Sequence, residues 1–423
     1  MKKIKWVGSA ALAIALVLFF SSASFADDTD ALLKLLVEKG LITENESRTV
    51  KAEVKEEKGF LSKKGVKVEI SGATEVEIVD VQEDHTTLDS VTTSTADRTN
   101  QFERPHLQVD KVTLRATVTS VDETIGFSSE LEFDEAETAF FDDAYIFLKD
   151  VEIYETKHFV KAGLMSRWIE PKRVFESYPI AGIPYWEDEE LQIIYGGEWE
   201  WLYWRLSASN GLNLDDKGAT EGGATFEILH DDRSSDSDEI PTELGSIEWG
   251  AGAGVELDTD DFGKINIMGF YLGQKMQDAD YAKLNAIANY VSNTEDEQFR
   301  AGVNVDYKFE NFGVRGQYIA STDAKLDRWA AHIEPYYTFK LDYRYLKGLT
   351  PAVQLSWYDV DLKKDAISAT DARSWDRQKY TFGLIAKINK NLKWKNEYSV
   401  NDEDTGAGDV DNDEFISQLQ FKF

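Results

Sequence analysis

Apolar and polar residues alternate along many segments of this chain, and this period-two pattern constrains the fold more than any other feature. In the last ten residues, EFISQLQFKF, Leu419 and Phe421 share one parity, whereas Gln420 and Lys422 share the other. Such alternation predicts strands that have one apolar and one polar face. The pattern recurs at 66–71, 111–118, 125–133, 202–208, 247–257, 265–267, 299–309, 329–339, 353–357, 380–388 and 392–400.

Weaker segments near 142–150, 156–165, 190–197 and 311–321 bring the predicted number to about sixteen strands, each long enough to cross a bilayer when tilted. The connections differ in length on the two sides. Short turns are expected at Val121-Asp122, Gly196-Gly197, Glu310-Asn311 and 389–391, and long loops at 80–106, 165–189, 210–245, 274–297, 361–376 and 401–412. This asymmetry is typical of an outer-membrane barrel.

In hydrocarbon, every backbone N–H and C=O must be paired within the protein, and a closed sheet achieves this without leaving an edge. We therefore expect an all-β fold, a transmembrane antiparallel up-and-down β-barrel, in which the terminal strand pairs back to the first. The apolar parity would face lipid and the polar parity a wet interior. Outer-membrane lipid and lipopolysaccharide would then be its surroundings.

The beginning of the chain is different. Residues 1–26 read as a signal peptide, because three lysines precede an apolar run that ends in Ser24-Phe25-Ala26. Residues 27–62 predict a short periplasmic helical segment, either a hairpin that packs on another part of the protein or an element for oligomerisation or anchoring. Residues 63–423 would form the barrel.

Composition narrows the chemistry. The 423 residues contain no cysteine, which excludes disulfides, a CxxCH haem site and a thiol nucleophile. The formal net charge of −32 argues against a nucleic-acid partner, because phosphates require basic surfaces. We expect no cofactor.

Several stretches resemble a known family. The ending at Phe423 is similar to the terminal signature of Gram-negative outer-membrane barrels. ALLKLLVEKGLITENE, the region 161–190 and WLYWRLSASNGLNL resemble putative porins related to the phosphate-selective porins O and P. The resemblance implies a sixteen-stranded homotrimeric porin whose third extracellular loop folds into the pore. The lysine-rich phosphate ladder of the characterised members is not evident as a repeat, so phosphate specificity is not implied.

Among the charged residues that the alternation places on the polar face, basic residues outnumber acidic ones, although the chain as a whole is acidic. The basic positions are Lys111, Arg115, Arg205, Arg300, Lys308, Arg315, Lys340, Lys387, Lys393 and Lys395; the acidic ones are Glu130, Glu132, Glu248, Glu256, Asp306, Glu334 and Glu397. If loop 165–189 folds inward, a constriction would form between its charges and a facing basic wall. The predicted constriction residues are Arg167, Glu170, Lys172, Arg173, Glu176, Arg115, Arg205, Arg300 and Arg315. Alternatively, each arginine pairs with a lumenal carboxylate for structure alone.

Many of the acidic residues lie in the long loops 210–245 and 401–414. Clustered carboxylates there could share divalent ions with lipopolysaccharide, or be simply solvated. The run Asp409-x-Asp411-x-Asp413 resembles a calcium loop, but Glu414 stands where that loop requires glycine. No specific metal site is predicted.

The predicted function is passive diffusion of small hydrophilic solutes and ions, with a mild anion preference. Three other functions remain open. A barrel lipase would need a Ser/His pair on the lipid side, where only His158 lies and no serine faces it. The chain could instead be a scaffold for a partner protein, or a channel specific for a phosphate-like solute.

Overall fold

The computed structural model describes residues 43, 60–63, 66–81, 105–134, 139–186, 189–211, 213–217, 228–232, 247–288, 290, 295–362, 367–368, 371–406 and 412–423. The chain divides into two compact units, one of residues 1–71 and 116–123, the other of residues 72–115 and 124–423. The predicted signal peptide and most of the predicted helical segment lie outside the described residues. No helix in the described part is long and apolar enough to span a membrane.

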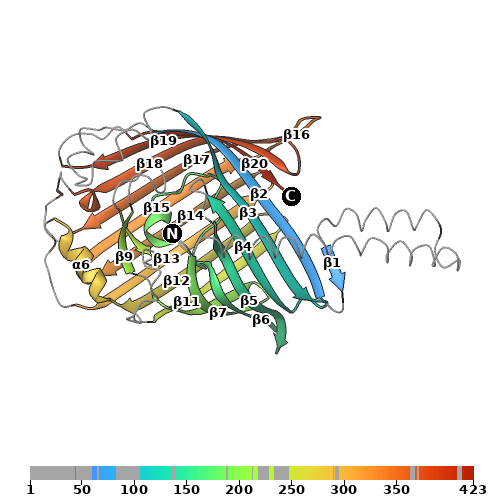
Figure 1. Cartoon of the computed structure of the whole chain (residues 1–423), viewed down its shortest axis with the longest axis horizontal. Coiled ribbons are helices and arrows are strands. Elements are labelled where there is room, and N and C mark those ends of the chain that lie inside the picture. Colours follow the sequence, from blue (N-terminus) through green and yellow to red (C-terminus); the bar gives the residue numbers. More distant parts are fainter. Residues whose placement is uncertain are drawn as a thin grey trace, which may run out of the picture. The chain divides into compact units, whose positions relative to one another are not determined.

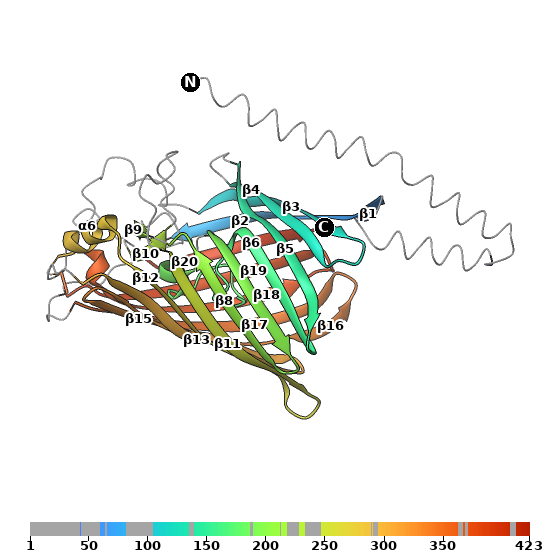
Figure 2. The same cartoon turned by 90° about the horizontal axis from the view of Figure 1, so that it is seen from below.

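The described chain is built almost entirely from strands, which lie side by side along the wall of a barrel (Figures 1 and 2). The strands are β1 (Phe60–Lys63), β2 (Val66–Val81), β3 (His106–Ser120), β4 (Ile125–Asp134), β5 (Ala139–Ile153), β6 (Thr156–Ser166), β7 (Glu189–Trp199), β8 (Leu202–Ser209), β9 (Asn213–Lys217), β10 (Ile228–Asp232), β11 (Glu248–Thr259), β12 (Gly263–Lys275), β13 (Glu297–Phe309), β14 (Phe312–Asp323), β15 (Leu326–Tyr337), β16 (Phe339–Tyr343), β17 (Leu346–Asp361), β18 (Asp376–Lys387), β19 (Leu392–Asp404) and β20 (Glu414–Lys422). The helices are α5 (Gly182–Tyr185), α6 (Asp278–Ala286) and the short 3₁₀ helix η2 (Ala372–Ser374).

Sixteen strands close into an antiparallel barrel, which confirms the predicted fold class. Strand β16 follows β15 and pairs with the same neighbour, β17, so the two count as one strand of the wall. Strand β1 pairs with the start of β2, and β9 and β10 form a separate hairpin. The wall closes where β20 pairs with β2, with Leu419 opposite Val76, and Phe423 exchanges backbone hydrogen bonds of 3.0 and 3.2 Å with Gly72.

The predicted division of the strands into two faces is also confirmed. In β7, Leu191 and Ile193 are 49% and 56% exposed on the outside, whereas Glu190 and Gln192 are buried on the inside. The same parity places Trp249 outside and Glu248 inside in β11. The outer face is therefore apolar, as a strand in contact with hydrocarbon requires.

One predicted turn is wrong. Gly196 and Gly197 lie inside β7 and pair with Phe159 and His158 of β6. A Cβ atom at Gly196 would lie 2.3 Å from the Phe159 ring, and one at Gly197 2.1 Å from the Trp204 ring. These glycines make room for aromatic rings on the two faces of the sheet, and β7 turns only after Trp199.

The connections on the loop side are less uniform than predicted. Four residues, 135–138, join β4 to β5, and Ala324 and Lys325 alone join β14 to β15. Ala324 adopts a left-handed conformation, with a φ of 55°, and its N–H donates to the Glu297 carbonyl at 2.9 Å. The other six connections on this side are the long loops that the sequence predicts.

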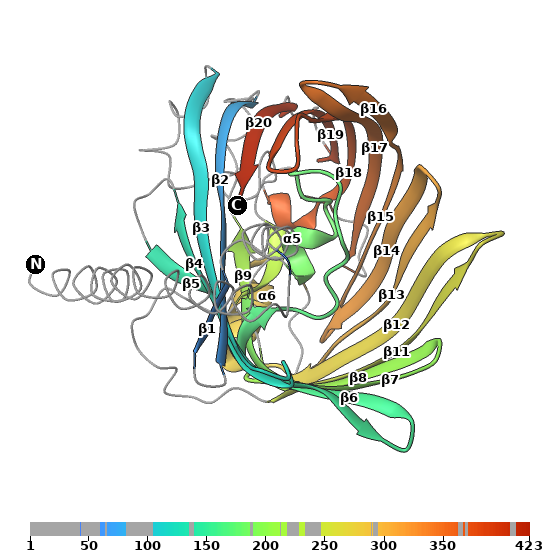
Figure 3. The same cartoon turned by 90° about the vertical axis from the view of Figure 1, so that its right-hand side faces the viewer.

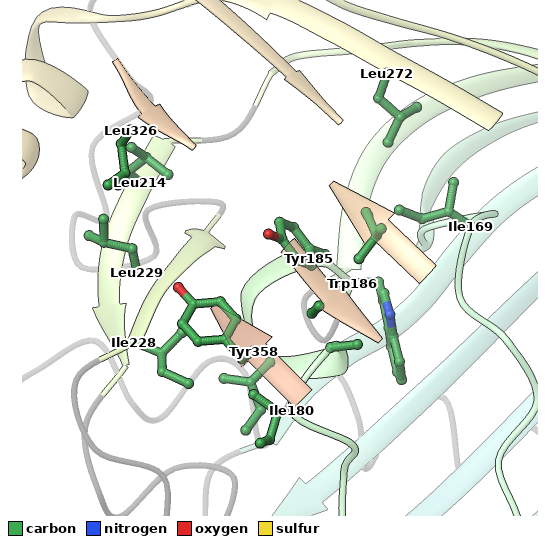
Figure 4. Packing of buried hydrophobic residues seen from close by; sticks show 14 of the residues in the cluster. Ile169, Ile180, Tyr185, Trp186, Leu214, Ile228, Leu229, Leu272, Leu326 and Tyr358 are labelled. Atoms are coloured by element: carbon green, nitrogen blue, oxygen red, sulfur yellow. The ribbon is translucent and has the colours of Figure 1, made fainter. Parts of the chain in front are cut away.

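The interior is not lined by polar residues alone. A hydrophobic cluster lies inside the barrel and joins the segment before β7, the β9–β10 hairpin and α6 to the wall (Figures 3 and 4). Its members include Ile169, Ile180, Ile183, Tyr185, Trp186, Leu214, Ile228, Leu229, Leu272, Leu284, Leu326 and Tyr358. The interior therefore contains apolar packing besides the polar face that the sequence predicts, because three long connections contribute apolar side chains to it.

Helix α6 is attached to the hairpin by a buried carboxylate. Asp280 is fully buried, and it accepts hydrogen bonds from the N–H of Leu214 at 2.6 Å and of Gln277 at 2.8 Å. Burial raises the pKa of Asp280 to about 6, although these two hydrogen bonds oppose the rise. Asp280 thus both caps α6 and holds β9 against it.

The outer face predicts how the barrel responds to an added charge. Ile333, in the middle of the continuous β15–β16 segment, is 40% exposed on the outer face. The substitution Ile333→Arg should reduce the free energy of unfolding by about 2–4 kcal/mol, because the guanidinium would enter hydrocarbon. Urea titration of the protein refolded into vesicles would measure this change.

Phe262→Arg is the matched control, because Phe262 is 76% exposed in the turn between β11 and β12. It should cost less than about 1 kcal/mol. Equal losses for the two variants would contradict a lipid-facing β15.

Candidate functional site: the loop inside the barrel

The segment between β6 and β7 folds into the barrel, and its described part, residues 167–186, is called the inward loop here (Figure 3). The Ile169 carbonyl accepts hydrogen bonds from Asn304 of β13 at 2.8 Å and Gln317 of β14 at 3.0 Å. The indole of Trp186 donates to Gln317 at 2.8 Å. Polar side chains of the inner wall thus satisfy both the backbone and the side chains of the loop.

Farther along, the inward loop is anchored by carboxylates of the last strands. Glu397 of β19 accepts the N–H of Glu176 at 2.8 Å and the N–H of Ser177 at 3.0 Å. The Ser177 hydroxyl contacts Glu414 of β20 at 3.1 Å and accepts from Lys379 of β18 at 2.6 Å. These contacts hold the loop against the β18–β20 wall.

Glu176 itself forms an ion pair with Lys395 of β19. Burial alone would raise the pKa of Glu176, but the nearby Lys395 ammonium and the hydrogen bond that it donates lower the pKa to about 2. The Lys395 ammonium therefore favours the charged form of Glu176, which strengthens this ion pair.

A buried ionic network holds the other end of the inward loop. Arg167 donates to Glu248 at 2.6 Å, to Glu190 at 3.2 Å and to Asp231 at 3.2 Å, and all four residues are buried. Asp231 belongs to the β9–β10 hairpin, so this arginine connects the loop, the hairpin and two wall strands.

Arg300 and Arg328 extend the network along the wall. Arg300 donates to Asp231 at 2.7 Å and lies 3.1 Å from Asp323. Arg328 donates to the same Asp323 at 2.6 Å. Three buried guanidinium groups thus share four carboxylates, an arrangement in which each charge depends on its partners.

The nine predicted constriction residues therefore divide into two groups. Arg167 and Arg300 are buried in the ionic network, where each binds carboxylates. The other seven are only partly buried or exposed on the loop and the facing walls: Glu170, Lys172, Arg173, Glu176, Arg115, Arg205 and Arg315.

On the loop, Arg173 lies over the Tyr178 ring, with its Cζ 3.6 Å from the ring centroid, and Lys172 is exposed. Arg315 of β14 donates to the Arg173 carbonyl at 2.7 Å. Burial raises the pKa of Glu170, and Arg173 opposes this rise. The negative charges of Asp142 and Asp143 of β5 also raise this pKa, so the loop interacts electrostatically with the facing wall.

The facing wall is formed by β3, β4 and β5 and carries alternating charges. Arg115 pairs with Glu130 and, at 2.8 Å, with Asp143, and Lys111 lies 3.9 Å from Glu132. Opposite charges here lie within one wall as well as across the interior. A field between charges of the loop and charges of the facing wall stays a prediction.

A cavity of about 250 Å³ opens at the start of the inward loop. It is lined by Asp143, Tyr145, Phe159, Lys161, Met165, Ser166, Trp168, Ile194 and Arg205. Arg205 donates to the Trp168 carbonyl at 3.2 Å, and the Lys161 ammonium lies 5.1 Å from the Tyr145 ring centroid. Within the described chain no ion pair is formed by either Lys161 or Arg205, and Asp143 is the one acid of the lining, so the charges that line the cavity are on balance positive.

Sequence reasoning missed Lys161 and the hairpin residue Asp231. Lys161 lies on the polar face of β6, and its neighbours Val160 and Ala162 lie on the apolar face. The alternation in this segment is weak, so the sequence did not place its charged residues on the inner face. Asp231 lies in an acidic stretch that has the composition of a solvated loop, and no local signal distinguishes it.

Comparisons with known proteins support the fold. No protein-family model matches the chain, and no curated protein matches its sequence. Among solved structures, the outer-membrane channel DcaP of Acinetobacter baumannii is similar with a TM-score of 0.57 at 15% identity, over 86% of this chain and 99% of that one. OmpF of Salmonella typhi, in complex with daunomycin, has a TM-score of 0.54 at 10% identity, over 86% and 100%.

The anion-selective porin of Comamonas acidovorans is also similar, with a TM-score of 0.52 at 11% identity, over 85% of this chain and 100% of that one. At such low identity these likenesses show the fold alone, which is that of a porin barrel. The narrower resemblance to the phosphate-selective porins O and P is not confirmed by them.

The ionic network predicts a large effect of one substitution on stability. Arg167→Met removes the cation between three buried carboxylates, and it should lower the free energy of unfolding by about 3–5 kcal/mol. Tryptophan fluorescence during urea unfolding in vesicles would measure it. Lys172→Met, on the exposed part of the same loop, should change stability by less than about 0.5 kcal/mol. Similar values for both variants would refute the structural role of Arg167.

Proposed function

We propose that this protein is an outer-membrane porin whose water-filled channel allows passive diffusion of small hydrophilic solutes and ions. The observation that carries this proposal is a charged loop fixed inside a closed barrel whose outer face is apolar. A barrel with such an exterior suits a bilayer, and a loop within it narrows the interior to a size at which charge selects among solutes.

The position of the channel follows from the attachment of the inward loop. The loop is hydrogen-bonded at its start to β7, β8 and β11 and farther along to β13, β14, β15, β18, β19 and β20. Solutes would therefore pass on its other side, along β3 to β6. The partly exposed charges Glu170, Lys172 and Arg173 would face Lys111 and Arg115 across this passage.

We further propose a mild preference for anions. Lys161 and Arg205 contribute positive charge at the cavity beside Trp168, and most charges of the facing wall are paired with each other. In a narrow wet passage, charge is screened less than in bulk water, so these two cations, which outnumber the single acid Asp143 of the cavity, attract anions there. Acidic residues of the outer loops would oppose this effect at the mouth.

The cellular setting belongs to the same proposal. Export through a cleaved signal peptide of residues 1–26 would deliver the chain to the outer membrane, where lipid and lipopolysaccharide surround the barrel. A homotrimer is the assembly that the resemblance implies. An enzymatic role has less support, because His158 on the outer face contacts Tyr195 at 2.7 Å and stacks on its ring, an arrangement without a nucleophile.

Planar-bilayer recordings test both parts of the proposal. The purified full-length protein should form ion-conducting channels whose reversal potential, under a salt gradient, indicates anion preference. The double variant Lys161→Gln/Arg205→Gln should lower the anion-to-cation permeability ratio by roughly twofold or more, because it removes two charges from a weakly screened passage.

Lys340→Gln is the matched control, because Lys340 is exposed in β16 and lies away from the cavity. It should leave the ratio unchanged. Absence of conductance would overturn the channel itself. Conductance with cation selectivity, insensitive to the double variant, would overturn only the anion preference.

A further inference from the structure

Three carboxylates from separate parts of the chain converge at the seam of the barrel. Glu75 lies on β2, Asp110 on β3 and Glu176 on the inward loop, and each offers one oxygen within 4.8 Å of the other two. These residues belong to the same compact unit. Three like charges at this separation repel one another unless a cation or protons lie between them.

One of the three carries an oxygen without a partner. Glu75 is only 4% exposed, and its Oε1 accepts a hydrogen bond from Gln420 at 2.6 Å. Its Oε2 is buried and has no hydrogen-bond partner within the described chain. A buried carboxylate oxygen that lacks a partner is costly, so a ligand that binds oxygen would relieve that cost.

One basic residue nearby, Lys395, pairs with Glu176 and so compensates one of the three acids, whereas Lys111 lies 3.9 Å from Glu132. Within the described chain, neither Glu75 nor Asp110 forms an ion pair. A fourth acid, Glu77, adjoins the group and accepts a hydrogen bond from Gln108 at 2.8 Å. The neighbouring Gln418 amide also has a buried oxygen without a partner. Its nitrogen donates to Glu77 and to Asp110, each at 3.4 Å. Neutral amides thus contact Glu75 and Asp110 where a cation would compensate their charge.

A second group of acids on the same wall provides the contrast. Glu130, Asp142 and Asp143 also bring oxygens within 4.8 Å of one another. There, however, Arg115 pairs with Glu130 and, at 2.8 Å, with Asp143. A guanidinium thus pairs with two acids of that group, whereas Lys395 pairs with one acid of the first group, which leaves more charge there for a metal ion to compensate.

We propose that Glu75, Asp110 and Glu176 bind a hard divalent cation of the calcium class, which ties the inward loop to β2 and β3. Calcium takes carboxylate oxygens at about 2.3–2.6 Å, so ligands on opposite sides of the ion lie roughly 5 Å apart. Magnesium requires a stricter octahedron and keeps several of its waters, so three carboxylates from separate elements suit calcium better. The proposal is independent of whether solutes pass through the barrel.

The experiment measures the unfolding temperature of the purified full-length protein in detergent, with chelator and with added calcium chloride. A ligand that binds only the folded state raises this temperature. Calcium should raise it for the wild-type protein. Glu75→Gln and Asp110→Asn, two nearly isosteric variants, should each lose most of the shift, with affinity lower by roughly tenfold or more because fewer charged ligands remain.

Asp142→Asn is the matched control, because it removes one acid from the group that Arg115 neutralises. It should keep the full shift. Equilibrium calcium binding should give one tight site per chain in the wild type and in Asp142→Asn, and none in the other two variants. If the wild type shows no shift, or if all variants keep it, the proposal is overturned, since calcium would then bind only elsewhere, such as the acidic loops.

Discussion

The structure depends on one requirement, that no backbone hydrogen-bonding group of the wall is left without a partner. Strand β20 meets β2 in register, and the last residue exchanges two hydrogen bonds with Gly72, so the sheet has no edge. With the backbone satisfied, the outer face is free to be apolar, as Leu191 and Ile193 are in β7. The inner face can then carry charges, because neighbouring side chains and internal loops compensate them.

The interior shows what it takes to keep long segments of chain inside a barrel. Apolar side chains of the inward loop, the β9–β10 hairpin and α6 pack together, and Arg167 provides the polar counterpart by binding carboxylates from three elements. Hydrophobic burial contributes the attraction, whereas directed ion pairs fix the position of each segment. One part of the interior is thereby filled, and charged side chains remain on the side of β3 to β6.

The sequence predicts the strands of the wall well, because local alternation is enough to identify a strand, as at Trp249 and Glu248. Glycines that suggest a turn but lie inside a strand, such as Gly196, are few. It predicts the interior less well. Arg300 has the same parity as Arg205, yet one is buried in a network and the other borders a cavity. Arg300 is buried because it binds Asp231, a residue that is distant in the sequence. The alternation of apolar and polar residues along a strand contains no information about such a partner.

The anchoring of the inward loop has a consequence for the order in which the barrel is completed. Ser177 contacts Glu414, which lies 237 positions later in the chain. The loop is made well before its anchors, so its final position is fixed only when the last strands are in place. Assembly of the wall and placement of the loop are thus one cooperative event, whose many long-range contacts favour slow folding.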